Sequence, residues 1–152
     1  MNGIIALAGR PNTGKTTLFN ALTGLRQRVA NFAGCTVEKA VGTIEVDDRE
    51  LEIVDLPGTF SLCAASPDEE VAFLFLSQTA ASGRPMQIFC VAEASNLAND
   101  SALAVSLRDC HYPVTLIVNM VDEAALNDIE IDADVLSQEL GMPVLLVSAR
   151  QR

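Results

Sequence analysis

The sequence predicts a three-layer α/β fold in which helices cover both faces of a mostly parallel sheet. Short apolar runs alternate along the chain with amphipathic helical stretches, which is the order of elements in such folds. The first apolar run, Ile4 to Ala8, is unbroken, as expected of a central strand that is buried on both faces. The length of 152 residues suits one domain with one continuous core.

The first half of the chain contains one clear helix and one clear hairpin. The helix should run from Lys15 to about Thr23 and end near Gly24. Residues 25–38 show no periodicity and should form a long loop, and loops of that length are usually functional. Strands at 41–46 and 51–54 should pair as a hairpin, which supplies one antiparallel edge strand.

The second half begins with a helix whose start carries three signals. Ser66 can cap it, Pro67 suits its first turn, and Glu69 completes a capping box. This helix should reach about Thr79. The elements expected after it are strands at 87–91, 114–118 and 144–147 and helices at 97–108 and 132–140.

The composition argues against several classes of site. A formal net charge of −10 disfavours a nucleic-acid partner, because phosphate backbones are bound by Lys and Arg. No apolar run reaches the roughly 18 residues of a membrane span, and we expect a soluble chain. The four cysteines form no C-x-x-C pair and the single histidine stands alone, so neither a zinc site nor a disulfide scaffold is expected.

The clearest motif lies between the first strand and the first helix. Gly9-Arg10-Pro11-Asn12-Thr13-Gly14-Lys15-Thr16 matches the phosphate-binding pattern G-x-x-x-x-G-K-[ST]. Lys15 should bridge the β- and γ-phosphates, and Thr16 should offer its hydroxyl to Mg²⁺. A glycine-rich turn with a chance lysine is disfavoured by the strand–loop–helix context. The residues expected to bind nucleotide here are Gly9, Asn12, Thr13, Gly14, Lys15, Thr16 and Thr17.

A second phosphate motif, Asp55-Leu56-Pro57-Gly58, directly follows an apolar strand. Asp55 should hold a Mg²⁺-bound water, and the Gly58 N–H should face the γ-phosphate. Taken alone the motif is weak, because a strand that ends in Asp before a Pro-Gly turn would look the same. Its position after the first motif favours the functional interpretation.

Residues that would select guanine follow the last two strands. Asn119-Met120-Val121-Asp122 resembles the N-K-x-D motif of small GTPases, with Met in place of Lys. The Asp122 carboxylate can accept from guanine N1–H and the 2-amino group, whereas adenine would leave it unpaired. Ser148 and Ala149 should form the last base-contacting loop, with the Ala149 N–H at guanine O6. Because open α/β sheets bind ligands at the carboxyl ends of their strands, these motifs together predict binding of GTP or GDP.

Together the motifs resemble the cytosolic GTPase domain of the ferrous iron transport protein B (FeoB) family. The resemblance covers nearly the whole chain and rests on G-x-P-N-x-G-K-T-T-L-F-N-x-L-T-G at 9–24, G-C-T-V-E at 34–38, D-L-P-G-T-F-S-L at 55–62, D-E at 68–69 and N-M-V-D-E-A at 119–124. It implies a Ras-like P-loop GTPase fold, with residues 1–152 forming one FeoB-type G domain. It also implies hydrolysis of GTP to GDP and phosphate by a switch that regulates ferrous iron uptake.

The resemblance also implies parts beyond this chain. The family's G domain continues with a final helix, a helical domain and a membrane transport domain, and it lies on the cytoplasmic face of the bacterial cell membrane. None of these further parts is present in the 152 residues. Without a helix after Val147 the sheet should leave an apolar strip, so self-association into a homo-oligomer is expected.

Several residues depart from the family pattern. Arg10 stands where the family usually has Asn, and Cys35 and Phe60 stand where it usually has a small apolar residue and Tyr. Where the family typically reads V-D-A-x-x-L-E-R-N-L, this chain has Glu93 for Asp and A-N-D at 98–100. The changes in this last stretch concern helix contacts rather than nucleotide binding.

The long loop should carry the residues that sense the γ-phosphate. Thr36 is its only threonine, and the resemblance implies that its hydroxyl binds Mg²⁺ while its N–H meets the γ-phosphate. Gly34 and Cys35 should lie beside the nucleotide with it. An ordinary loop threonine is the alternative. The catalytic residues expected on this basis are Lys15, Asn12, Thr36 and Gly58.

Hydrolysis should be slow without a further aid, because Thr59 stands where Ras-like enzymes carry a water-orienting Gln. The resemblance implies K⁺, held by the Asn12 side chain and by backbone carbonyls before Thr36, to offset charge on the phosphates. Arg26 or Arg28 acting in cis is the rival explanation. An ordinary turn role for Asn12 is the third.

Two other functions stay open. One is a ribosome-assembly or RNA-modification GTPase, against which the acidic charge and the Asn-Met-x-Asp variant argue. The other is a guanine-nucleotide-binding module with negligible turnover, which the missing Gln allows. A catalytic-base role for Glu69 and Glu70 is disfavoured, because the helix dipole explains acidic residues in a first helical turn.

Overall fold

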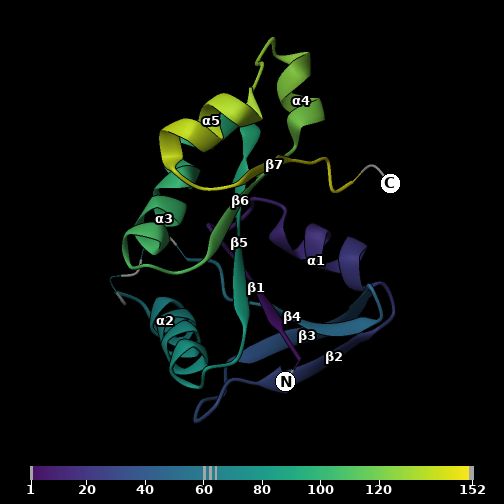
Figure 1. Cartoon of the computed structure of the whole chain (residues 1–152), viewed down its shortest axis with the longest axis vertical. Coiled ribbons are helices and arrows are strands. Elements are labelled where there is room, and N and C mark those ends of the chain that lie inside the picture. Colours follow the sequence, from purple (N-terminus) through teal and green to yellow (C-terminus); the bar gives the residue numbers. More distant parts are fainter. Residues whose placement is uncertain (1, 60, 62, 64, 151–152) are drawn as a thin grey trace.

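The computed structural model describes residues 2–59, 61, 63 and 65–150. These residues form a seven-stranded sheet in the order β2-β3-β4-β1-β5-β6-β7 (Figure 1). The strands are β1 Ile4–Gly9, β2 Gln27–Asn31, β3 Glu38–Val46, β4 Arg49–Asp55, β5 Met86–Glu93, β6 Val114–Asn119 and β7 Val144–Leu146. The helices are α1 Lys15–Thr23, α2 Pro67–Ala81, α3 Leu97–Asp109, α4 Val121–Leu126 and α5 Ala133–Leu140, with a short 3₁₀ turn, η1, at Ala94–Asn96.

The sheet is mostly parallel and is covered on both faces, as predicted. β3 runs antiparallel to β2 and β4, and the other neighbours pair in parallel. α1 lies on one face, and α2, α3 and α5 lie on the other (Figure 1). Alternate side chains of β1 pack on opposite faces of the sheet. Ala6 belongs to the core beneath α2 and α3, and Leu7 packs with Phe19 of α1. The predicted three-layer α/β fold is therefore confirmed.

The prediction that residues 25–38 form one long loop is wrong, because part of this segment is strand β2. Gln27–Asn31 form a strand rather than part of a loop, and they pair antiparallel with β3, so β2 occupies the edge of the sheet. The side chains of β2 are mostly exposed, which removes the alternating apolar pattern by which a strand is recognised. The loop between β2 and β3 is therefore only residues 32–37.

The hairpin of β3 and β4 is confirmed and is closed by a two-residue turn. Val46 pairs with Arg49, and Asp47 and Asp48 between them have φ angles of 49° and 60°. Two successive left-handed residues form a type I′ turn, whose twist matches that of the paired strands.

Helix starts follow the predicted caps where a polar side chain is available. Ser66 Oγ accepts from the Glu69 N–H at 3.2 Å, and Asp132 Oδ1 accepts from the Val135 N–H at 3.1 Å. The six-residue α4 is not predicted, because its N-cap Met120 makes no side-chain cap and the helix is too short to establish a period. No helix in the described part of the chain combines the length and the apolar character that a membrane span needs.

Candidate nucleotide-binding site

A pocket of about 480 Å³ lies at the carboxyl end of β1. β1 lies between β4 and β5, so the strands that follow it in the sequence are placed first on one side of β1 and then on the other. Open α/β sheets form their ligand crevice at such a switch in strand order. The residues of the two phosphate motifs and of the base motif that line the pocket are Arg10, Pro11, Asn12, Gly14, Lys15, Thr16, Gly58 and Met120. The other residues that line it are Thr17, Asp68 and Arg150.

The phosphate-binding motif at residues 9–16 is called the P-loop below, and its conformation depends on Gly14. Its φ is +85°, and a Cβ at this position would come within 2.2 Å of Asn119 Nδ2. Only glycine permits this close approach in a left-handed backbone conformation. α1 begins at the next residue, Lys15, so the first amide groups of the helix point toward the loop.

Lys15, which lines the pocket, forms a largely buried ion pair with Asp55. The Lys15 ammonium donates to the Asp55 carboxylate and, at 2.5 Å, to the Leu56 carbonyl oxygen. The Thr16 hydroxyl lies 3.5 Å from the second carboxylate oxygen of Asp55. Because β4 pairs with β1 in parallel, the two strand ends meet, and the structure brings together these three sequence-predicted residues.

The segment after Asp55 lies directly against the P-loop. The Thr59 N–H donates to the Gly9 carbonyl oxygen at 2.9 Å, and Thr59 is buried, with 4% of its surface exposed. At Gly58 a Cβ would come within 3.0 Å of Pro11 Cγ. This packing places Gly58 in the wall of the pocket, as the sequence predicted, and it encloses Thr59.

Asn119 connects the base motif to two other loops. Its Nδ2 donates to the Thr13 carbonyl oxygen at 3.1 Å, and its Oδ1 accepts from the Ala149 N–H at 3.0 Å. Ser148 Oγ donates to Asp122 Oδ1 at 2.9 Å. The sequence-predicted base residues therefore meet, although they come from the ends of β6 and β7.

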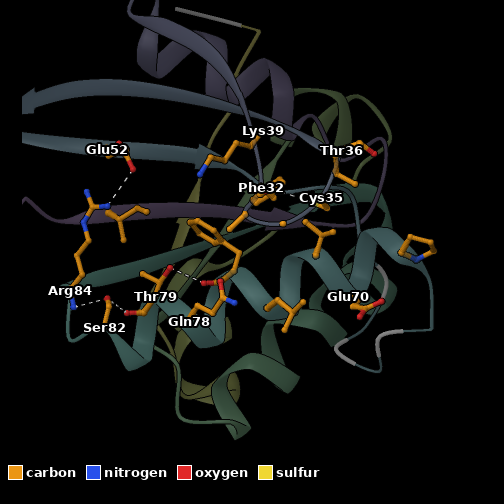
Figure 2. Close-up of a pocket in the computed structure, with 18 residues that line it drawn as sticks. Phe32, Cys35, Thr36, Lys39, Glu52, Glu70, Gln78, Thr79, Ser82 and Arg84 are labelled. Atoms are coloured by element: carbon orange, nitrogen blue, oxygen red, sulfur yellow. Dashed lines mark hydrogen bonds and ion pairs between the residues drawn. The ribbon is translucent and has the colours of Figure 1, made fainter.

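The structure places Gly34, Cys35 and Thr36 at a different pocket. They line a cavity of about 670 Å³ between loop 32–37 and α2. Figure 2 shows Cys35 and Thr36 on the loop side of this cavity and Glu70 on α2 opposite them. The structure therefore does not bring Thr36 together with Thr16 and Asp55.

Phe32 holds the loop in this position. It is buried, and its ring meets that of Phe75 on α2 edge to face, with centroids 5.6 Å apart. The Lys39 ammonium lies 5.5 Å and 5.7 Å from the centroids of the two rings. The Phe32 N–H donates to the Val37 carbonyl oxygen at 3.0 Å, which closes the loop on itself.

The residues expected to assist hydrolysis lie in two different pockets. Asn12 lines the P-loop pocket, whereas Arg26 and Arg28 line another pocket beside Thr43. Arg28 also pairs with Glu52 at 3.5 Å. Two cations that the sequence reasoning missed, Arg10 and Arg150, line the P-loop pocket instead. They stand outside the fixed letters of the motifs, so no pattern identifies them.

Cys90 is a buried thiol with no access to the pocket. Burial raises its pKa from 9.0 to about 12, and the negative charge of Asp100 contributes to the rise. A thiol with such a pKa stays protonated at neutral pH and is a poor nucleophile. Cys90 is thus part of the core.

Comparison with known proteins gives one consistent relationship. Residues 3–152 match the family described as ferrous iron transport protein B. The chain is 44% identical over 153 residues to the Fe(2+) transporter FeoB of Salmonella typhimurium and, with the same figures, to that of Escherichia coli K12. In both cases 97% of this chain is aligned with 19% of the relative, so the chain spans about a fifth of the length of these relatives.

Solved structures show the same relationship. A mutant of S. thermophilus NFeoB bound to mGDP has a TM-score of 0.90 and 40% identity, covering 100% of this chain and 56% of that one. The G domain of the T. maritima FeoB iron transporter has a TM-score of 0.85 and 37% identity, covering 99% and 89% of the two chains.

Proposed function

This chain belongs to the ferrous iron transport protein B family, and we propose that it binds GTP with Mg²⁺ and hydrolyses it to GDP and phosphate. The observation that carries the proposal is the meeting of four separate segments around one pocket. Lys15 lines this pocket and is paired with Asp55, and Asn119 bonds to the P-loop. Solved relatives hold GDP or mGDP, which supports a guanine nucleotide as the ligand.

Lys15 is proposed to bind the β- and γ-phosphates. Its ammonium is bound to the Asp55 carboxylate and the Leu56 carbonyl, and phosphate oxygens would replace these acceptors when nucleotide binds. The exchange keeps the buried cation paired throughout, which avoids the cost of an isolated buried charge.

Thr16 and Asp55 are proposed to hold Mg²⁺, Asp55 through a water molecule. Their oxygen atoms lie 3.5 Å apart, and a hydroxyl with a carboxylate is a donor set that suits this hard cation. Bound Mg²⁺ neutralises charge on the β- and γ-phosphates. The N–H of Gly58, in the pocket wall, is proposed to bind the γ-phosphate.

Asp122 is proposed to select guanine by accepting from N1–H and the 2-amino group. The Ser148 hydroxyl orients the carboxylate by donating to Oδ1 at 2.9 Å. Asn119 fixes the distance between this site and the phosphate site, because it bonds to both Thr13 and Ala149. Met120 lines the pocket and offers an unbranched apolar side chain to the nucleotide.

Two segments are proposed to be the switches, namely residues 25–38, which include strand β2 and loop 32–37, and residues 56–67. Thr36 now lies beside α2, so its proposed roles at Mg²⁺ and the γ-phosphate require loop 32–37 to move toward the P-loop. The edge-to-face contact of Phe32 with Phe75 is the main packing that this movement would disturb. We propose that GTP favours the moved loop and that GDP favours the observed one.

K⁺ held by Asn12 is the aid to hydrolysis that we propose. Asn12 lines the pocket while Arg26 and Arg28 do not, which favours the ion over a cis-acting arginine from that strand. The buried Thr59 is too short to orient a water molecule as a Gln does, so the intrinsic rate is proposed to be slow.

The larger protein is proposed to be a ferrous iron transporter, because the relatives are Fe(2+) transporters. Residues 1–152 would be its G domain, attached to the membrane transport domain on the cytoplasmic face of the bacterial cell membrane. Leu145 and Leu146 on the edge strand β7 are 51% and 38% exposed. We propose that the 152-residue chain self-associates into a homo-oligomer through this apolar edge.

Release of phosphate from GTP tests the proposed function. The native chain should release phosphate with Mg²⁺ present, and Lys15→Ala should abolish release. Thr36→Ala should slow release but leave GDP affinity unchanged, because GDP has no γ-phosphate for Thr36 to contact. Equal loss of GDP affinity in both variants would contradict this division of roles.

A further inference from the structure

Arg10 and Asp100 form an ion pair between the P-loop and α3. Arg10 Nη1 lies 3.4 Å from Asp100 Oδ1, with 28% of the arginine side chain and 4% of the aspartate side chain exposed. The two residues are 90 positions apart in the chain.

The position of the Asp100 carboxylate is set by three donors. Its Oδ2 accepts from the Glu93 N–H at 2.9 Å, and its Oδ1 accepts from Asn96 Nδ2 at 3.1 Å as well as from Arg10. A buried carboxylate is costly unless its oxygens are paired in this way. Asp100 is therefore a fixed negative charge at the end of β5, against which the arginine is oriented.

Arg10 is one of the residues that line the P-loop pocket. It lines the wall together with Gly58, the residue whose N–H is proposed to bind the γ-phosphate. Of the other cations that line the pocket, Lys15 is bound to Asp55, and Arg150 is mostly exposed and paired with Glu123 at 3.1 Å. Arg10 differs from both, because its side chain is 28% exposed and it is held by a carboxylate from α3 that is almost fully buried.

The backbone of Arg10 belongs to the same network as the base motif. Its carbonyl oxygen accepts from Thr13 Oγ1 at 3.1 Å, and the Thr13 carbonyl oxygen accepts from Asn119 at 3.1 Å. The ion pair with Asp100 therefore anchors one end of a loop whose other end is anchored by Asn119.

We propose that Asp100 is a positioning residue that holds the Arg10 guanidinium at the γ-phosphate end of the pocket, where Arg10 favours a nucleoside triphosphate over a diphosphate. The inference rests on the proposed function and adds to it a residue that discriminates between the two nucleotides. A positive charge near the third phosphate stabilises GTP selectively, because GDP places no charge there.

The test measures the affinities of GDP and of GMPPNP, a GTP analogue that is not hydrolysed, with Mg²⁺ present. Arg10→Gln should weaken GMPPNP binding about fivefold or more, as expected for a partly exposed charge pair, and change GDP binding less than about twofold. Asp100→Asn should shift the ratio of the two affinities in the same direction. In the Arg10→Gln background it should shift the ratio no further.

Two control variants show whether the affinity ratio depends on the charge of residue 10 and on the location of that charge. Arg10→Lys keeps the charge and should retain most of the preference for GMPPNP. Arg28→Gln removes a cation that pairs with Glu52 away from the pocket, and it should leave the ratio unchanged. Thermal unfolding of each variant without nucleotide shows whether Asp100→Asn is folded at the temperature of the binding measurement.

The outcomes distinguish this inference from the proposed function. A native chain that binds both nucleotides, with the same affinity ratio in Arg10→Gln, overturns the role of Arg10 and leaves the proposed function intact. Additive effects of Arg10→Gln and Asp100→Asn on the ratio overturn the positioning role of Asp100. A native chain that binds neither nucleotide overturns both proposals.

Discussion

The side-chain amide of Asn119 donates to the Thr13 carbonyl oxygen across 3.1 Å, and this bond joins the end of β6 to the P-loop. The same side chain accepts from the Ala149 N–H at 3.0 Å. One buried amide therefore holds three loops at a set separation, so the phosphate site and the base site are positioned together.

Replacing Asn119 with Ala should lower both stability and nucleotide affinity. The Thr13 carbonyl and the Ala149 N–H would lose their partner, and each buried polar group left unpaired costs about 1–3 kcal/mol. Urea unfolding measures the loss in stability. Asn127→Ala is the matched control, because Asn127 is exposed and bonds only locally to the Glu123 carbonyl at 3.2 Å. Similar losses in both variants would show that Asn119 does not connect the loops.

Phe32→Ala should destabilise the chain and release loop 32–37 from α2. Truncating a buried phenylalanine typically costs about 3–5 kcal/mol, and the edge-to-face contact with Phe75 would also be lost. Phe73 on the same helix is 40% exposed, so Phe73→Ala should cost about 1 kcal/mol or less. Unfolding by urea compares the two variants, and equal costs would mean that Phe32 does not anchor the loop.

The Cys90 thiol should make stability fall with pH in the alkaline range. Its pKa is raised by burial from 9.0 to about 12. Below pH 9 both folded and unfolded chains hold the proton, so the thiol adds no pH dependence there. Between pH 9 and about 12 only the unfolded chain releases the proton, so the free energy of unfolding falls as the pH rises.

Unfolding curves across this range, for the native chain and for Cys90→Ala, test that prediction. The variant should show a shallower decline than the native chain. The exposed Cys63 provides the control, since Cys63→Ser removes a thiol that lies outside the core and should keep the native slope. A native chain and a Cys90→Ala variant with identical slopes would contradict the raised pKa.

Potassium should stimulate GTP hydrolysis through Asn12. Rates are compared in K⁺ and Na⁺ at matched ionic strength, and the advantage of K⁺ should vanish in Asn12→Ala. Arg26→Ala and Arg28→Ala should keep the advantage, because both residues lie in another pocket. Identical rates in the two salts, with a large loss in Arg28→Ala or Arg26→Ala, would transfer the role to arginine.

The arrangement of the motifs is predictable because each carries its own backbone requirement. Gly14 is an example, since its left-handed φ and its approach to Asn119 Nδ2 leave no room for a side chain. Asp55 ends β4 and Asn119 ends β6, two strands that run in the same direction in one sheet, so both residues lie along the same edge of that sheet. The alternation of apolar runs and helices predicts that order of elements.

Other features have no local pattern that could predict them. β2 is held by backbone pairing with β3, and its exposed side chains carry no apolar alternation. The location of Thr36 beside α2 depends on the tertiary contact of Phe32 with Phe75. The pair of Arg10 and Asp100 joins positions 90 residues apart. Such contacts are set by the packed structure and not by neighbours in the sequence.

The most direct test of guanine recognition at this site is competition against labelled GDP. GTP should displace the label from the native chain while ATP does not, because adenine leaves the Asp122 carboxylate unpaired. Asp122→Asn should weaken GTP and GDP binding by about 1.5–3 kcal/mol, the usual value of a hydrogen bond to a charged group. The same variant should gain affinity for xanthosine nucleotides, since its amide can donate to the 2-oxo group. Displacement by ATP as effective as that by GTP would contradict the account.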